Sequence, residues 1–517
     1  MMKSNRVYIL MKIAIILILV SLVLPPSSAI HTQSYQHVLK WTTILPQVNS
    51  RNAPLIVDLN NDGVKEIIVG LTGQNFYDRG QGKIYVLNHD GSILPPWPID
   101  PEPGVDNMIS TAAVADINRD GHMEIVAGVP VNPEGQGDQW WENAIIKIYA
   151  YSYQGQLLNG FPIVVAEDGL YPWVTLSLAD LNNDGYSDII VNYYNQQYRA
   201  IVTAFNYRGE QLSGSWPVDI GNRAASPMAI ADVNGDGFKE IALGTDIRGI
   251  FLLRHNGTIL PGWPVDIGPG FEGTPVTMGD IDKNGRLEIV TSSWREGHKL
   301  VAYDYTGRCT LSIPCQYPDI YLRHEAALVD LDKDGDLEIL IPTFTRDYGT
   351  GRIDAFHHNG SLVKGWPVKY PGWIEDGESS NLVIGDIDND GQNEVIQPTY
   401  TDLNDPTVPP QERYNGFINA WKLNGSLVPG FPIKYPRSVV GYEGGSLVLT
   451  DLDGTGHIDI VSVRCEEANS IHPKTYVSVF RLPTKYCPWN IEWSMYHNNL
   501  QHTGVQPLNS VTTKSHR

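Results

Sequence analysis

The chain has 517 residues, 42% of them hydrophobic, so its length alone suggests about three average domains with a large buried core. Its net charge is −21, with 58 Asp and Glu against 37 Lys and Arg. This acidic balance argues against a nucleic-acid partner, because nucleic-acid binders carry clustered basic residues.

Residues 1–29 are typical of a signal peptide. Lys3, Arg6 and Lys12 precede an apolar run at 13–24, and small residues ending at Ala29 provide a cleavage site. The run is short for a membrane span, although an uncleaved anchor at 7–24 is the alternative. We therefore expect a secreted or cell-surface protein with no membrane span in the mature chain.

One pattern then recurs eight times: an apolar run, D-x-[ND]-x-[DNT]-G-x-x-[DE], and a second apolar run. The first copy is PLIVDLNNDGVKEIIVG, at 54–70. The copies begin with Asp58, Asp116, Asp180, Asp232, Asp280, Asp330, Asp386 and Asp451. Self-similarity at this period indicates a repeat architecture instead of three separate domains.

Each repeat continues with a short strand, a tight turn and a last strand. The turns contain Asp-Gly or Asn-Gly, as at Gly91 and Gly257, which are favoured hairpin sequences. The last strand carries Trp-Pro or Phe-Pro, as at Pro98 and Pro367, and proline restricts a strand to a sheet edge. We therefore predict four antiparallel strands per repeat, with the proline-bearing strand outermost.

Units of four strands cannot bury their faces alone, so neighbouring units must stack, as propeller blades do. We predict an all-β fold, a β-propeller over residues 30–506, with eight blades; seven blades plus an appendage is the alternative. The segment 40–45 (KWTTIL) resembles an outer strand and is predicted to complete the last blade and close the ring. We expect residues 507–517 to be a disordered polar tail.

The acidic loops are predicted calcium sites. Positions 1, 3, 5 and 9 supply side-chain oxygens, position 7 a carbonyl, and the glycine at position 6 permits the sharp turn. An EF-hand places a glutamate at position 12, whereas here position 12 is Val69, within a strand, so the loops are β-hairpin sites. The predicted ligands are Asp58, Asn60, Asp62, Glu66; Asp116, Asn118, Asp120, Glu124; Asp180, Asn182, Asp184, Asp188; Asp232, Asn234, Asp236, Glu240; Asp280, Asp282, Asn284, Glu288; Asp330, Asp332, Asp334, Glu338; Asp386, Asp388, Asp390, Glu394; and Asp451, Asp453, Asp459.

Turn formation by Asp, Asn and Gly explains one such loop, but not an acid at position 9 in all eight. Carboxylates this close repel one another without a cation and raise one another's pKa. Two copies depart at position 5, where Asn284 and Thr455 stand. We therefore expect up to eight Ca²⁺ ions, with the fifth and eighth loops the weaker sites.

Four cysteines, an even number in an exported chain, favour disulfides. Of three possible connectivities, we predict the nearest-neighbour pairs Cys309–Cys315 and Cys465–Cys487.

With these motifs the chain resembles the FG-GAP/VCBS repeat family, the calcium-binding repeats of integrin α-subunit propellers. The motif copies span residues 50–480. The resemblance implies calcium on the hairpin between the first two strands of each blade. It is less informative about function, because the family includes adhesion propellers, lectins and the eight-bladed propellers of rhamnogalacturonan lyases, and fold does not determine activity.

If the calcium hairpins line one face, the opposite face carries loops of variable length, where function concentrates. Its aromatic and charged residues suit stacking on sugars or a protein hot spot, although such rings also pack between blades. The candidate ligand-binding residues are Trp141, Tyr171, Trp173, Arg223, Glu272, Arg323, His324, Glu325, Trp373 and Glu443.

We therefore predict a secreted calcium-binding propeller that acts as a binding or adhesion module for extracellular glycan or protein. No hydrolase or phosphate-binding motif is found, so we assign no catalytic residue and expect a protein that is not an enzyme. A polysaccharide lyase on the same scaffold is the alternative, with Arg323 and His324-Glu325 in principle able to abstract a proton. A purely structural surface protein is a third possibility.

Overall fold

The structure is a computed structural model, and it describes residues 37–506 except 48–52, 73–80, 133–142, 222–226, 246–248, 268–274, 294–298, 315–319, 322–324, 346–349, 372–381, 403–413, 436–444, 467–473, 496–497 and 500. The chain divides into two compact units, Met1–Gln36 and His37–Arg517. The predicted signal peptide and the tail at 507–517 lie outside the described residues. All that follows concerns the second unit.

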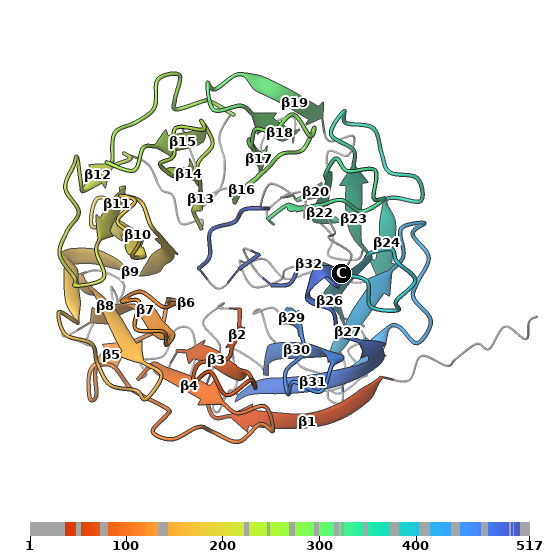
Figure 1. Cartoon of the computed structure of the whole chain (residues 1–517), viewed down its shortest axis with the longest axis horizontal. Helices are drawn as coiled ribbons and strands as arrows, with labels where there is room; N and C mark the ends of the chain where they lie inside the picture. The colour runs from red at the N-terminus through yellow and green to blue at the C-terminus, as the bar shows by residue number, and fades with distance from the viewer. Residues whose placement is uncertain are drawn as a thin grey trace, which may run out of the picture. The chain divides into compact units, whose positions relative to one another are not determined.

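The described residues form seven antiparallel sheets that follow one another around a ring (Figure 1). The first four sheets in chain order are β2 (Leu55–Val57), β3 (Glu66–Leu71) and β4 (Lys83–Leu87); β5 (Asp106–Asn107), β6 (Thr111–Ala115), β7 (Glu124–Asn132), β8 (Ala144–Ser152), β9 (Ile163–Ala179), β10 (Asp188–Asn195), β11 (Ala200–Phe205) and β12 (Val218–Asp219); β13 (Ala229–Ala231), β14 (Glu240–Thr245) and β15 (Gly249–Leu253); and β16 (Val276–Gly279), β17 (Glu288–Ser293), β18 (Lys299–Tyr303) and β19 (Cys309–Pro314). The other three are β20 (Ile320–Tyr321), β21 (Ala327–Val329), β22 (Glu338–Thr345), β23 (Thr350–Phe356) and β24 (Val368–Pro371); β25 (Val383–Gly385), β26 (Glu394–Asp402), β27 (Tyr414–Trp421), β28 (Ile433–Lys434) and β32 (Ile491–Trp493); and β1 (Val38–Leu45), β29 (Ser446–Thr450), β30 (His457–Glu466) and β31 (Lys474–Lys485).

Neighbouring repeats share their hydrophobic cores. One cluster joins Ile148 of the second repeat to Leu176 and Val191 of the third, and another joins Ile250 of the fourth repeat to Met278 of the fifth. Strands such as β3 are consequently buried on both faces, which is why they read as continuous apolar runs and not as alternating ones. The expected stacking of repeats is confirmed.

Proline-bearing segments lie at sheet edges, as predicted. β12, β24 and β28 are edge strands, and each begins directly after a Trp-Pro or Phe-Pro pair. In the first and fourth repeats the outer strand is reduced to isolated bridges, such as Ile84 to Ile99 and Ile250 to Val265. Proline cannot donate to a ladder, so these edges hold few backbone hydrogen bonds.

One strand joins two repeats, which the sequence did not lead us to expect. β9 pairs with β8 between Ile163 and Gly169, and with β10 at Gly169 and again from Val174 to Ala179. Because the two pairings share Gly169, one continuous strand connects the two repeats with no separate loop. Tyr171 and Trp173 therefore lie within strand β9, and their placement on a loop between repeats was wrong.

The N-terminal strand completes the last sheet, as predicted. β1 pairs antiparallel with β31, with Val38 opposite Arg481 and Leu45 opposite Thr475. It also contacts the next repeat, because the Trp41 indole donates to the His89 carbonyl at 2.9 Å. The two ends of the repeat array are therefore joined by a strand from the start of the chain.

The C-terminal segment runs through the middle of the ring in Figure 1, where it follows the 3-10 helix η1 (Pro488–Asn490). β32 pairs with β25, and the following carbonyls accept N–H groups of innermost strands in several repeats. The donors, with their acceptors, are Leu449 to Ser494, Leu178 to Gln501, Ile230 to Thr503 and Met278 to Gly504. One extended segment thus links inner strands that lie far apart in the sequence.

The predicted disulfide between Cys465 and Cys487 is absent, since both are free thiols. Cys465 is buried beside Thr475, with 3.5 Å between Sγ and Oγ1. Cys309 is also a free thiol, and its predicted partner Cys315 lies outside the described residues.

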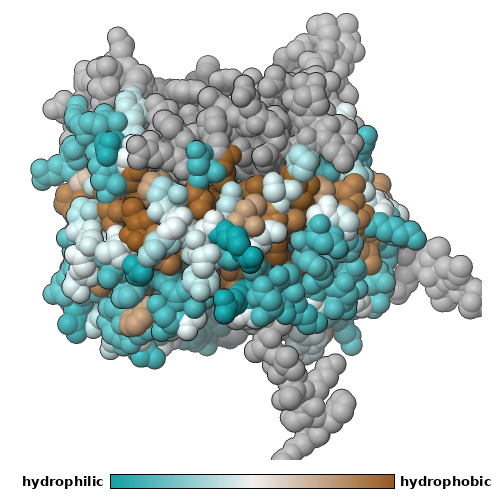
Figure 2. Space-filling model, turned by 90° about the horizontal axis from the view of Figure 1, so that it is seen from above, coloured by the Kyte–Doolittle hydropathy of each residue, from teal (hydrophilic) through white to brown (hydrophobic). Residues whose placement is uncertain are grey.

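Figure 2 shows a band of hydrophobic side chains across the side of the molecule that it displays, with hydrophilic side chains on one flank. Exposed large apolar residues recur at one position of the second hairpins: Ile93, Leu157, Ile259, Leu362 and Leu427. Among the described residues, no helix has the length and apolar character to cross a bilayer.

Candidate calcium loops and a groove between repeats

The acidic loops connect the first two strands of each repeat, where the motif predicts them. In the first repeat the loop runs from Asp58 to Glu66, between β2 and β3. Asp58 accepts the N–H groups of Asp62 and Gly63 through its two oxygens, at 3.0 and 2.8 Å. These bonds fold the loop around its acids, so the carboxylates converge instead of spreading into solvent.

The ninth-position acid is buried at the base of every loop. It begins the second strand in seven repeats and is the third residue of β30 in the eighth. One carboxylate oxygen always accepts the N–H of the residue at position 2. The donors are Leu59, Ile117, Leu181, Val233, Ile281, Leu331, Ile387 and Leu452, to Glu66, Glu124, Asp188, Glu240, Glu288, Glu338, Glu394 and Asp459.

Several loop carboxylates, at positions 1 and 9, keep a buried oxygen with no hydrogen-bond partner. Oδ1 of Asp188, Oε1 of Glu394, Oδ1 of Asp180 and Oδ1 of Asp330 are of this kind. A buried, unpaired carboxylate oxygen is costly unless a cation satisfies it. Together with side-chain oxygens at four loop positions and a carbonyl, this donor set fits Ca²⁺, which takes six to eight oxygen ligands.

Burial also raises the pKa of these acids. The pKa of Glu66 rises to about 7 because the side chain is buried, an effect that the Leu59 N–H opposes and that Asp62 and Asp58 reinforce. The pKa values of Glu338 and Glu394 rise to about 8, again chiefly through burial. A bound cation would lower these pKa values again, because it stabilises the ionised form that burial disfavours.

Among the described residues, the acids of the fifth, sixth and seventh repeats form close groups. Carboxylate oxygens of Asp280, Asp282 and Glu288 lie within 4.8 Å of one another, as do those of Asp386, Asp388 and Glu394. In the sixth repeat His357 lies within the same distance of Asp332 and Glu338. The motif alone does not find this histidine, because it stands at the end of the third strand.

Two loops contain basic side chains that the motif does not reveal. In the seventh, Lys422 contacts Asp388 at 2.5 Å and Asp390 at 2.7 Å. In the eighth, Lys40 contacts Asp453, and Arg481 contacts Asp453 and Asp459. Several of the acidic loops are compatible with calcium.

The loops of neighbouring repeats are hydrogen-bonded to one another. The Asn61 amide donates to the Gly121 carbonyl in the next loop at 2.6 Å, and Asn183 donates to Gly237 at 2.7 Å. Lys239 reaches back to the Asp180 carbonyl at 3.0 Å. A change in one loop therefore acts directly on the contact between two repeats.

The predicted ligand-binding residues are mostly outside the described part of the chain: Trp141, Arg223, Glu272, Arg323, His324, Trp373 and Glu443. Tyr171 and Trp173 lie in β9. Glu325 is half-buried just before β21.

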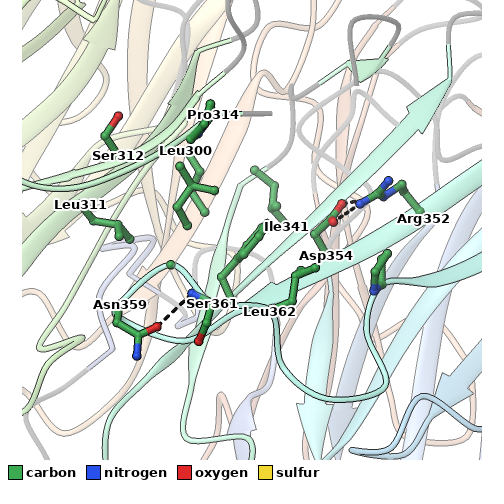
Figure 3. A pocket seen from close by; sticks show the side chains of 14 residues that line it. Leu300, Leu311, Ser312, Pro314, Ile341, Arg352, Asp354, Asn359, Ser361 and Leu362 are labelled. Atoms are coloured by element: carbon green, nitrogen blue, oxygen red, sulfur yellow. Dashed lines mark hydrogen bonds and ion pairs between the residues drawn. The ribbon is translucent and has the colours of Figure 1, made fainter. Parts of the chain in front are cut away.

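A groove of about 460 Å³ lies between the fifth and sixth repeats (Figure 3). Leu300, Leu311 and Ile341 line its apolar wall. The buried pair of Arg352 and Asp354 on β23 lies at one side, with 2.8 Å between Arg352 Nε and Asp354 Oδ2. An apolar hollow with a few fixed polar groups has the character of a ligand site. The sequence patterns did not reveal this groove, because its walls come from two different repeats.

The sequence matches the FG-GAP-like repeat model over residues 58–127, 180–243, 232–291 and 330–396. Phosphatidylinositol-glycan-specific phospholipase D of Rattus norvegicus is 28% identical over 149 residues, 26% of this chain and 17% of that protein. Integrin alpha-6 of Homo sapiens is 30% identical over 145 residues, 26% of this chain and 12% of the integrin. The alignments thus span less than a fifth of either relative.

Solved structures extend the likeness to most of the fold. The biofilm matrix protein Bap1 of V. cholerae superposes with a TM-score of 0.56 and 16% identity, covering 89% of this chain and 94% of that chain. Rhamnogalacturonan lyase YesW gives 0.55 and 17%, covering 88% and 76%. The fold is therefore propeller-like. The chain carries FG-GAP-like repeats and is distantly similar, through them, to integrin α-subunits and phosphatidylinositol-glycan-specific phospholipase D.

Proposed function

We propose that this protein is a secreted, calcium-stabilised β-propeller that binds an extracellular glycan or protein. The observation that carries the proposal is the near-complete mutual coverage with the biofilm matrix protein, 89% of this chain and 94% of that one. The lyase YesW is covered over only 76% of its length, so part of that enzyme has no counterpart in the superposition. This difference favours a matrix or binding role over catalysis.

We further propose eight blades, one for each motif. The support is that each acidic loop joins the first two strands of one repeat, and that the single eight-stranded sheet contains two such loops, at Asp116 and Asp180. Counting that sheet as two blades gives one blade per motif. Export through residues 1–29 would place the loops in millimolar calcium, where extracellular sites of modest affinity fill.

A glycan array and a panel of pectic substrates separate binding from catalysis. We expect calcium-dependent retention of a glycan or of a matrix protein, with no new product. If 235 nm absorbance rises on pectic substrates, as unsaturated uronides accumulate, the lyase alternative replaces the binding proposal, and the likeness to YesW and to the Bacillus licheniformis lyase would extend beyond the fold.

The substitution Glu240→Gln is expected to remove one calcium ion per chain and about 1.4 kcal/mol of stability. The figure assumes a Kd of about 10⁻⁴ M in about 1 mM calcium. The amide can still accept the Val233 N–H, so the change isolates the lost charge. Metal counting by mass spectrometry measures the loss of calcium. The control is Glu210→Gln, the same change at an exposed site. An unchanged count would remove the fourth loop from the calcium sites.

If the ligand occupies the groove, Leu362→Trp should reduce its affinity at least tenfold, because the indole would fill part of the apolar wall. Leu362 is 45% exposed, so the fold should tolerate the change. Leu157→Trp is the matched control, at the same hairpin position of the second repeat and 42% exposed. Equal affinities for both variants and the wild type would place the ligand elsewhere.

A further inference from the structure

The eighth loop differs from the others in containing two basic side chains among its three acids. Arg481 Nη2 lies 2.6 Å from Asp453 Oδ1 and 2.9 Å from Asp459 Oδ2, and its Nε donates to Asp459 Oδ1 at 3.0 Å. Lys40 Nζ lies 2.6 Å from Asp453 Oδ2. Arg481 is on β31 and Lys40 on β1, the strand that completes the sheet.

These contacts place two cationic groups against the oxygens that a metal would use. Both oxygens of Asp453 and both of Asp459 accept hydrogen bonds, and Asp451 Oδ2 accepts the Gly456 N–H at 2.8 Å. Asp451 Oδ1 is left as the loop's one carboxylate oxygen without a bond. What distinguishes this loop is that two cationic side chains, and not backbone N–H groups alone, contact Asp453 and Asp459, so the positive charge that Ca²⁺ would bring is already present.

The third loop provides a comparison within the same molecule. It also has three acids and also ends in an aspartate, Asp188. Arg481 is opposite Asp459, and the register of β10 and β11, extended by one residue, gives Asn206 as the counterpart for Asp188; the Asn206 amide donates to Glu210. Asp180 and Asp188 each keep a buried, unpartnered Oδ1. Asp180 and Asp188 of the third loop therefore keep oxygens that a cation could satisfy, whereas Asp453 and Asp459 of the eighth loop already contact basic side chains.

The seventh loop shows that one basic residue is not enough. Lys422 contacts Asp388 and Asp390 there, but Oε1 of Glu394 remains buried and unpartnered. That loop has four acids against one cation, whereas the eighth has three acids against two. The replacement of the fifth-position acid by Thr455 further reduces the charge of the eighth loop.

We propose that Arg481 and Lys40 take the place of the metal in the eighth loop, so that the ring is closed by a built-in ion-pair network and not by calcium. Lys40 ties the N-terminal strand to a loop that is 413 residues away in sequence. Closure of the ring then persists at calcium concentrations that empty the other loops. The inference rests on the proposed calcium sites only for the number of ions, seven instead of eight.

Two matched variants test the metal count. Asp188→Asn and Asp459→Asn make the same change at the ninth position of the third and eighth loops. We expect calcium per chain to fall by one in Asp188→Asn and to stay at the wild-type value in Asp459→Asn. A loss of one ion in Asp459→Asn would overturn the inference.

Lys40→Gln gives a second test, which does not depend on a count. If Lys40 replaces a metal, its loss should lower the unfolding temperature by about 1 °C, equally with calcium and with chelator. If the loop binds calcium, Lys40 repels the ion, so its loss should raise the unfolding temperature in calcium, and the inference fails. Should the wild type bind no calcium at all, the proposed calcium sites fail, while an equal loss in chelator would still support the ion-pair network.

Discussion

Chelation of calcium is expected to lower the unfolding temperature of residues 30–517 by about 10 °C. With a Kd of about 10⁻⁴ M and about 1 mM calcium, each filled loop adds about 1.4 kcal/mol, and seven loops add about 10 kcal/mol. That total is similar to the whole net stability of a typical domain. A chain of this size has an unfolding entropy of about 1 kcal/mol per degree, which converts the loss to about 10 °C.

The structure gives a reason for a concerted effect. Adjacent loops are bonded directly, as Asn61 is to Gly121 and Asn183 to Gly237. Emptying one loop leaves its acids to repel one another beside the contact between two repeats. Loss of calcium should therefore loosen the stacking of neighbouring sheets as well as the loops.

Calorimetry with EDTA, followed by back-titration with calcium, measures the effect. Magnesium is the control, because it demands a smaller, near-octahedral site and should restore little of the stability. Unfolding at the same temperature in EDTA and in calcium, with no metal found by mass spectrometry, would mean that the acidic loops are not metal sites.

Trp493→Ala is expected to cost about 3–5 kcal/mol of unfolding free energy, the range for removing a large buried aromatic side chain. Trp493 is 1% exposed and lies on β32, which pairs with β25 in the middle of the ring. It packs in the same core cluster as Trp366 and Trp421, from the sixth and seventh repeats. Truncation after Tyr486 should be more severe, because it also removes the acceptors of Leu178, Ile230 and Met278.

Trp489→Ala is the matched control for that variant. It removes the same side chain four residues earlier, where the indole is 80% exposed. Its effect should stay within about 0.5 kcal/mol, as for most surface changes. Urea unfolding of both variants measures how much unfolding free energy each one loses. Equal and small losses would show that the C-terminal segment does not stabilise the ring.

The repeats could be found from sequence because their signals are local. Each acidic loop, such as Asp58 to Glu66, lies within nine residues, and its glycine and acids recur in all eight copies. The outer position of strands after Pro217 or Pro367 follows from the missing N–H of proline. The closing strand was recognised because residues 40–45 resemble the outer strands of the repeats.

Tertiary structure alone decided the rest. Lys40 reaches Asp453 across 413 residues, and Ser177 Oγ donates to the His502 carbonyl across 325. Neither contact corresponds to a repeating pattern in the sequence. The fusion of two repeats through β9 depends on a short connection, and the groove beside Arg352 depends on how two sheets stack. Local patterns determined the repeats, the candidate metal ligands and the edge strands. Only the closed ring determined which loop holds its own cations and what occupies the centre, because those contacts exist only when distant parts of the chain meet.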